Sequence, residues 1–534
     1  MKLGVDFGTN RIIVAAADRG NYPLVSFDTP DGATADWFPS LIALKSGVAE
    51  SGNADRRYGW EAWEMQADES WIVVRSVKRF LEHAGPDTRL DLGEQAVKFT
   101  DLLNGLARAL FTAIRENSNL KVAPHETLQV VLGVPAHANS NQRFLTVDAF
   151  RATGFDVLGV LNEPSAASIE FGHRQRQTKA NRQTILVYDL GGGTFDASLV
   201  TLDEKVHHVI ASEGIPTIGG DDFDQILADL ALDAAGISDA AREGISAGGW
   251  FRLLDECRTK KESLNANSRR ISLDLESVNP TWGTVQVPVN SFYESARPLV
   301  EETISVAEDL LSKYNDNQFE ALYITGGGSE LPLVARMLRE RFGRRVRRSA
   351  YTRSATAIGL AIQADQPETY RLHERFTRFF GVWREADSGS RMIFDPLFEK
   401  GIPLPSPGSR NLTIRRVYRP VHNVGHFRFL ECSHRAEDGA PSGEITFWDE
   451  IRFPFDPSLT STELGSVPVT HSQNPPDERV AEVYECDAGG SIRVTIANES
   501  AGYSRTYRLG RWSTDTKPVK PARGRKKVSA ASNN

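Results

Sequence analysis

The chain has 534 residues, too many for one hydrophobic core, and its length predicts about three or four structural units. Its net charge of −8 excludes a generally basic surface for nucleic acid, and 40% hydrophobic residues are typical of a soluble protein. Three scattered cysteines argue against a disulfide framework or zinc site, and no apolar run reaches the ~18 residues of a membrane span. We therefore expect a cytoplasmic protein that contacts neither nucleic acid nor membrane.

The first 365 residues alternate between strand-like and helical patterns. The segments TLQVVLGVP (127–135) and QTILVYDL (183–190) are apolar, rich in β-branched residues and end at turns, so they predict buried strands. Residues 299–311 repeat apolar side chains at helical spacing and predict an amphipathic helix. This alternation is typical of an α/β fold.

The pattern changes after a polar stretch at 366–375, QPETYRLHER, which we interpret as an exposed linker. Residues 376–515 contain short alternating segments such as NLTIRRV and SIRVTIAN, separated by clusters of Pro, Gly and Asn. They predict an antiparallel β-sandwich domain. Residues 516–534 are basic and poor in apolar side chains, so we expect a disordered, solubilising tail.

One phrase occurs twice: LGVDFGTN near the start and LVYDLGGGTFD near the middle. Its aspartates, Asp6 and Asp189, lie 183 positions apart, and each ends an apolar run before a glycine-containing turn. Free N–H groups in such turns can hold phosphates, and aspartates can hold hydrated Mg²⁺. Two facing copies would hold a polyphosphate between two similar lobes. No G-x-x-x-x-G-K-[ST] motif is present, so this is not a P-loop.

These phrases occur together with VLNEPSAASIEFG (160–172), IGGDDFDQIL (218–227), LYITGGGSELPLV (322–334) and ATAIGLAIQA (355–364). In this order the set closely resembles the nucleotide-binding domain of DnaK-type heat-shock chaperones, in the actin/sugar-kinase/heat-shock ATPase superfamily. The resemblance implies a two-lobed, duplicated actin-like ATPase domain at 1–365. It also implies ATP or ADP and Mg²⁺ as ligands, and Mg²⁺-dependent ATP hydrolysis as the activity.

The resemblance further assigns roles to individual residues. Asp6 and Asp189 would hold Mg²⁺ through water, while Lys78, Glu163, Asp189 and Thr194 would carry catalysis. Lys78 would face the γ-phosphate, and Glu163 would hold a metal-bound water. The remaining nucleotide contacts would come from Gly8, Thr9, Asn10, Gly191, Gly192, Gly193, Lys261, Gly326, Gly327 and Gly328. Pro135 and Arg143 match a switch that relays the state of the γ-phosphate, although Pro135 could equally be a simple strand terminator.

The sequence departs from the family pattern near the base of the nucleotide. Asn10 replaces a usual threonine, and Glu330 replaces the arginine that stacks on adenine. On the helix covering the base, Glu262 and Arg258 carry charges opposite to those of many members. These changes put the strength of adenine binding in question but leave the phosphate residues in place.

The C-terminal part resembles the family's peptide-binding β-sandwich through MIFDPLFEKGIPLP (392–405), and we expect no counterpart of the family's helical lid. The expected function is that of an ATP-dependent chaperone for protein folding and stress response, with unfolded or extended polypeptide clients and co-chaperones as partners. Three alternatives stay open: a regulatory chaperone relative with a weak ATPase, a small-molecule kinase, and an actin-like filament protein.

Overall fold

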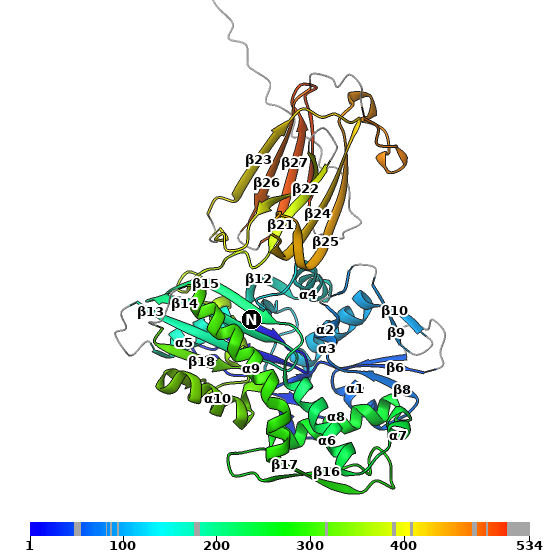
Figure 1. The fold of residues 1–534 in the computed structure, drawn as a ribbon, viewed down its shortest axis with the longest axis vertical. Coiled ribbons are helices and arrows are strands. Elements are labelled where there is room, and N and C mark those ends of the chain that lie inside the picture. Colours follow the sequence, from blue (N-terminus) through cyan, green and yellow to red (C-terminus); the bar gives the residue numbers. More distant parts are fainter. Residues whose placement is uncertain are drawn as a thin grey trace, which may run out of the picture. The chain divides into compact units, whose positions relative to one another are not determined.

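The computed structural model describes residues 1–46, 55–81, 83–85, 88–92, 95–175, 182–314, 319–386, 391–405, 409–471, 478–487 and 490–509. The chain divides into two compact units (Figure 1): Met1–Phe379 with Phe398–Ser406, and Phe380–Leu397 with the chain from Pro407 onward. The tail expected at 516–534 lies outside the described residues. Within the described ranges, no helix combines the length and hydropathy that a bilayer span requires.

The first lobe of the first unit is built on a five-stranded sheet in the order β12-β11-β1-β2-β5. Strands β1 and β2 form an antiparallel hairpin, and β11 and β12 extend the sheet in parallel with β1. The predicted strand at 127–135 is confirmed as β11. The bounds are β1 (Lys2–Phe7), β2 (Arg11–Ala16), β5 (Phe38–Pro39), β11 (Gln129–Val134) and β12 (Asp156–Asn162).

The second lobe repeats this arrangement in a six-stranded sheet, in the order β19-β18-β13-β14-β15-β20. Strands β13 and β14 form the hairpin, and β18 and β19 continue in parallel with β13. The shared strand order confirms the duplicated two-lobed α/β fold. The bounds are β13 (Gln183–Leu190), β14 (Phe195–Asp203), β15 (Val206–Ile215), β18 (Ala321–Thr325), β19 (Val346–Arg348) and β20 (Arg371–His373).

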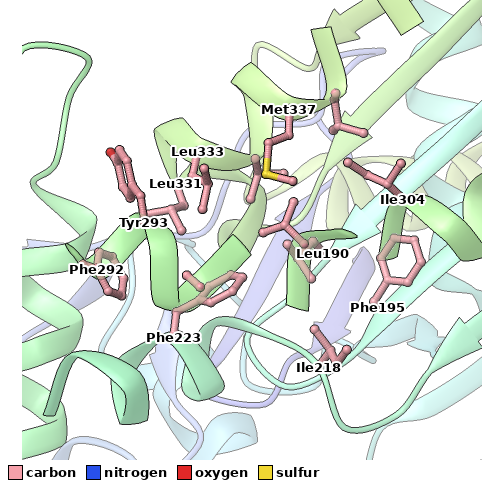
Figure 2. Packing of buried hydrophobic residues seen from close by; sticks show 14 of the residues in the cluster. Leu190, Phe195, Ile218, Phe223, Phe292, Tyr293, Ile304, Leu331, Leu333 and Met337 are labelled. Atoms are coloured by element: carbon pink, nitrogen blue, oxygen red, sulfur yellow. The ribbon is translucent and has the colours of Figure 1, made fainter. Parts of the chain in front are cut away.

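The largest core cluster lies in the second lobe and anchors the second glycine turn. Leu190 and Phe195, which flank that turn, are fully buried beside Ile218 and Phe223 (Figure 2). Burial of side chains of this size stabilises the fold by ~1.5–3 kcal/mol each. The turn between them is therefore fixed at both ends, although the glycines themselves contribute no packing.

The helices follow the predicted apolar periodicity. The helix expected at 299–311 is confirmed within α9, which buries Val300, Ile304 and Leu311 and tolerates Pro298 in its interior. The helices are α1 (Trp60–Glu64), α2 (Val77–Phe80), α3 (Phe99–Glu116), α4 (Ser140–Ala152), α5 (Glu163–Arg174), α6 (Gly220–Ala234), α7 (Asp239–Glu243), α8 (Ala247–Glu262), α9 (Val289–Lys313), α10 (Pro332–Phe342) and α11 (Ala355–Asp365).

Helix α11 approaches its neighbours closely through glycine. A Cβ atom on Gly359 would lie 1.8 Å from the carbonyl oxygen of Ala166 in α5, and one on Gly4 of β1 would lie 2.2 Å from the backbone nitrogen of Ala361. No side chain fits at such distances without moving backbone atoms. The glycines therefore set the spacing of β1, α5 and α11, and β1 and α5 carry Asp6 and Glu163.

Smaller sheets complete the lobes. They pair β3 with β4, β9 with β10, and β16 with β17, and order three strands as β7-β6-β8. Their bounds are β3 (Phe27–Asp28), β4 (Thr34–Ala35), β6 (Ile42–Lys45), β7 (Arg56–Tyr58), β8 (Trp71–Val74), β9 (Arg89–Leu92), β10 (Gln95–Lys98), β16 (Arg270–Asp274) and β17 (Thr284–Pro288).

The stretch 366–375 does not have the exposed character expected of a linker. Its residues 371–373 form β20, which pairs in parallel with β15. Tyr370 is 1% exposed, and its hydroxyl lies 3.0 Å from Nδ1 of His173. Glu374 accepts a hydrogen bond from the backbone N–H of Asn162 at 3.0 Å. The polar composition of the stretch does not indicate the strand pairing at 371–373 or the deep burial of the Tyr370 ring.

The second unit is an antiparallel β-sandwich, as predicted. Its sheets run β22-β21-β24-β25 and β23-β26-β27-β28, and aromatic rings such as Phe429 and Tyr484, 6.1 Å apart, pack between them. The bounds are β21 (Phe379–Ala386), β22 (Arg391–Phe398), β23 (Leu412–Tyr418), β24 (Val424–Arg435), β25 (Pro441–Pro454), β26 (Val480–Cys486), β27 (Ile492–Asn498) and β28 (Tyr503–Arg508).

A buried ion pair also joins the two sheets of the sandwich. Arg384 of β21 donates two hydrogen bonds to Glu482 of β26, at 3.0 and 2.5 Å, and a third to Asp395 of β22 at 2.6 Å. Glu482 is fully buried. If one partner were removed, the other would be left as an unpaired buried charge. The ion pair therefore favours the observed packing of the two sheets over others.

Candidate functional site

A cavity opens between the two lobes of the first unit. It collects nearly every predicted site residue: Asp6, Gly8, Thr9, Asn10, Lys78, Glu163, Asp189, Gly191, Gly192, Thr194, Lys261, Gly326, Gly327 and Gly328. Gly193 is the exception. It lies behind the turn, with its carbonyl oxygen accepting a hydrogen bond from Arg79 at 3.0 Å.

The two copies of the repeated phrase face this cavity from equivalent hairpins. Residues 8–10 form the turn between β1 and β2, and residues 191–194 form the turn between β13 and β14. The second turn is closed by a hydrogen bond from the N–H of Gly191 to the carbonyl oxygen of Thr194, at 2.9 Å. A Cβ atom on Gly192 would lie 3.2 Å from the side-chain nitrogen of Asn10, so the turns approach each other directly.

Lys78 and Glu163 meet on the cavity wall. The Lys78 ammonium donates a hydrogen bond to Oε1 of Glu163, and the two residues are 6% and 7% exposed. Burial opposes the charge on Lys78, but Glu163 and then Asp6 raise its pKa above the ordinary value. Lys78 therefore remains a fixed cation within the cavity.

The aspartates are crowded by like charges. Burial, and then the neighbouring Glu163, raises the pKa of Asp6 to about 7. Burial, followed by Glu163 and Asp6, raises the pKa of Asp189 well above its usual range. A site in which carboxylates resist ionisation gains stability from an added cation.

This donor set fits hydrated Mg²⁺. The ion prefers oxygen ligands and usually keeps several of its waters. Asp6 and Asp189 supply carboxylate oxygens, and their pKa values are raised first by burial and then by neighbouring carboxylates. Among the described residues, no three acidic, histidine or cysteine side chains are grouped to hold a metal ion directly.

The expected switch residues contact the site at its rear. Backbone N–H of Ala136, next to Pro135, donates to Asp196 at 2.8 Å, and Asp196 follows the second glycine turn. Arg143 donates a hydrogen bond to the side chain of Asn162, the residue before Glu163. The backbone of Asn162 in turn donates to Glu374. A chain of contacts thus leads from Glu163 to the segment beyond α11.

The far end of the cavity is lined by the third glycine phrase and by α8. Gly326, at φ 84°, starts a turn that continues as the 3₁₀ helix η4 (Gly327–Glu330). Lys261 of α8 does not present a free charge. Its ammonium lies 2.6 Å from Asp224 and donates to the carbonyl oxygen of Gly220 at 2.5 Å.

An ion-pair network occupies the region where the sequence departs from the family. Glu262 accepts hydrogen bonds from Arg11 and Arg353, each at 2.9 Å. Arg353 also donates to Glu330 at 2.6 Å, and Arg348 lies 3.1 Å from the other oxygen of Glu330. These three arginines balance the two glutamates and leave one positive charge, so the acidic substitutions do not make this end negative.

Sequence reasoning missed several lining residues. Arg353 and Thr352 directly precede the ATAIG phrase, and Asp224 lies within the IGGDDFDQIL phrase. Their positions beside recognised phrases were an available signal. The cavity also includes Arg11, Ile13, Gly220 and Thr356, together with Arg258 and Glu262, which the sequence analysis noted only as departures.

Comparisons with known proteins agree with this geometry. A family model described as Hsp70 protein matches residues 106–369. The chain is 30% identical over 380 residues to the chaperone protein HscA homolog of Burkholderia ambifaria (strain MC40-6), covering 68% of this chain and 58% of that protein. It is 31% identical over 378 residues to the chaperone protein HscA of Serratia proteamaculans (strain 568), covering 68% and 57%. The matches thus span little more than half the length of these relatives.

Proposed function

Because this chain belongs to the Hsp70 family, we propose that it is an ATP-dependent chaperone, which hydrolyses ATP in its first unit and binds extended apolar polypeptide with its second. One observation carries the proposal. The cavity between the lobes gathers both copies of the repeated turn, Lys78, Glu163 and the two aspartates. A fixed cation and paired glycine turns are the groups that phosphoryl transfer needs.

In the proposed reaction, the phosphates of ATP lie between the turns at 8–10 and 191–194. Lys78 stabilises the charge that develops on the γ-phosphoryl oxygens, and Glu163 keeps the ammonium in place. Asp189 orients the attacking water, and Thr194 contacts the phosphates from the second turn. Asp6 and Asp189 would hold Mg²⁺ through water, and the bound ion would neutralise part of the polyphosphate charge.

The second unit offers an edge for an extended polypeptide. In its sheet, β25 is terminal among the described strands, and it is 14 residues long. Ile445 and Phe447 on this strand are 55% and 54% exposed. An edge strand presents unpaired backbone groups, and apolar side chains beside it provide contacts for the peptide's own side chains. We therefore place client binding along β25.

The test is ATP turnover with and without an unfolded client. We expect the protein to bind ATP in the presence of Mg²⁺, to hydrolyse it, and to do so faster with a reduced, unfolded model protein. A labelled apolar peptide should bind the wild type, and binding should weaken in an Ile445→Ser and Phe447→Ser double variant. Absence of ATP binding would refute the ATPase, and unchanged peptide affinity in the double variant would refute the placement on β25.

A second candidate is a regulatory relative with slow hydrolysis. The network of Arg11, Glu262, Arg353 and Glu330 favours it, because ion pairs fill the end of the cavity that a base would approach. Under this alternative, ATP binds but single-turnover hydrolysis stays slow and an unfolded client does not accelerate it.

A further inference from the structure

Asp221 contacts three segments that surround the proposed phosphate site. It lies in the first turn of α6 in the second lobe. Its two carboxylate oxygens accept hydrogen bonds from the Asn10 amide and the Ser76 hydroxyl, both at 2.5 Å. Its backbone N–H donates to the carbonyl oxygen of Gly192 at 2.8 Å. The guanidinium of Arg75 lies 3.5 Å away.

These contacts cross from one lobe to the other. Asn10 belongs to the first glycine turn and Ser76 to the loop that precedes Lys78, and both are in the first lobe. Asp221 and Gly192 are in the second lobe. The carboxylate of Asp221 thus connects the first glycine turn with the segment that carries the lysine, and its backbone N–H holds the second glycine turn. Separation of the lobes would break the Asn10 and Ser76 contacts together.

Ser76 depends on this contact for its conformation. Its backbone adopts φ 58° and ψ 38°, in the left-handed region that is unfavourable for residues other than glycine. It precedes the four-residue helix α2, and its side chain makes no capping hydrogen bond to that helix. The hydroxyl is instead bound to Asp221, so the turn that aims Lys78 is held from the opposite lobe.

Asp221 is suited to remain charged in this position. Its side chain is 11% exposed and that of Arg75 is 16% exposed. Burial opposes ionisation, but Arg75 and the hydrogen bonds from Ser76 and Asn10 bring the pKa of Asp221 below its usual value. A carboxylate in the first turn of a helix is further stabilised by the helix dipole.

We infer that Asp221 is a positioning residue, which ties closure of the two lobes to the placement of Lys78 beside the phosphates. The inference rests on the proposed ATPase, since it concerns the same site. Without Asp221, the loop at 75–78 keeps its backbone strain and loses the contacts of Ser76 and Arg75 to that carboxylate, while Arg75 keeps its longer contact to Asp224 at 3.8 Å. When a reaction depends on a precisely positioned group, a displacement of that group by about 1 Å reduces the reaction rate by as much as ~10²-fold.

The first experiment needs no enzymatic activity. Hydrogen–deuterium exchange is compared between the wild-type protein, Asp221→Asn and the matched control Asp229→Asn, which alters an exposed carboxylate on the same helix. Asp221→Asn keeps the backbone N–H and the shape of the side chain. We expect exchange in peptides covering residues 75–81 to accelerate by about tenfold or more, while the control exchanges as the wild type does. Unchanged protection at 75–81 in Asp221→Asn would overturn the inference.

The second experiment separates positioning from a general structural effect. Single-turnover ATP hydrolysis should fall by about tenfold or more in Asp221→Asn, while the Kd for ADP changes by less than about threefold, since the turns retain their backbone donors. Ser76→Ala should show a smaller loss in the same direction. Faster exchange with normal hydrolysis would overturn the positioning role. A wild-type protein that neither binds nor hydrolyses ATP would instead refute the proposed function, and the exchange result would still decide whether Asp221 anchors the loop.

Discussion

The ammonium of Lys78, from the short helix α2, donates a hydrogen bond to the carboxylate of Glu163 at the start of α5, and both groups are buried. The two residues are 85 positions apart in the chain. Their pairing places a positive charge beside Asp6 and Asp189 on the wall of the cavity. The chemistry and the stability of the site therefore depend on the same contact.

Replacing Lys78 with alanine should reduce single-turnover ATP hydrolysis by ~10²-fold or more, because a positioned cation is lost from the phosphoryl site. ATP binding should persist. The variant should also be less stable, since Glu163 is left buried without its partner. Rapid-quench hydrolysis and thermal unfolding measure both effects, with Lys260→Ala on the exposed face of α8 as control. Hydrolysis equal to that of the wild type would show that Lys78 is not catalytic.

Asp189→Asn should have the opposite effect on stability. Burial and the nearby carboxylates raise the pKa of Asp189, so the charged side chain destabilises the nucleotide-free fold near pH 7. The neutral amide should raise the melting temperature of the nucleotide-free protein, while ATP hydrolysis falls by ~10²-fold. Differential scanning calorimetry without nucleotide provides the measurement. A lower melting temperature would contradict the proposed charge crowding.

Arg353 should contribute to binding of the nucleotide base. Its guanidinium donates hydrogen bonds to Glu262 and Glu330, and its side chain lines the cavity, so we expect its planar face to stack on the base. Arg353→Ala should weaken the binding of ATP by about tenfold, since a cation over an aromatic ring contributes up to ~2 kcal/mol to binding. The binding of inorganic tripolyphosphate, which has no base, should weaken by less than about twofold. Isothermal titration compares the two ligands. Arg348→Ala is the control, and an equal loss for both ligands would exclude a contact to the base.

Gly359→Ala should destabilise the first unit. The new Cβ atom would lie 1.8 Å from the carbonyl oxygen of Ala166, so helices α5 and α11 must separate. Overpacking of this kind costs about 1–3 kcal/mol or more. Gly159→Ala is a suitable control, because a Cβ there meets no atom within 4 Å. Urea unfolding of both variants tests this, and equal midpoints would show that the helices can adapt.

Stability should fall at mildly acidic pH because of His207. Burial, and then the neighbouring His208, lowers the pKa of His207 from 6.5 to about 4. The unfolded chain therefore binds the proton more readily, and about 3 kcal/mol of stability is lost as the pH falls from about 6.5 toward 4. Melting temperatures from pH 7.5 to 4.5 should decline less steeply for His207→Gln than for the wild type. The exposed His125→Gln should follow the wild type.

The glycine turns were predictable because each is encoded by a short continuous segment, in which the glycines themselves indicate a tight turn. Both copies and the third phrase at 326–328 lie on the cavity as expected. Asp221 and Arg353 were not predictable as contacts, since their partners lie in distant segments and single charged residues have no local signature. The stretch 366–375 was misread for a related reason. A three-residue strand is too short for an alternating pattern, and Tyr370 is the one residue of that stretch found deeply buried.

Strand β20 also determines how this protein can be shortened. A chain cut at residue 365 would lose the partner of β15, whose residues 206–208 pair with 371–373, and it would lose the ring of Tyr370 from beside His173. The exposed backbone of β15 would be free to recruit a strand from another molecule, and the vacated space would be apolar and open. Such a fragment is expected to aggregate, whereas one extended to residue 379 keeps the edge covered. The practical limit of the nucleotide-binding part is thus set by backbone pairing and lies beyond its last helix.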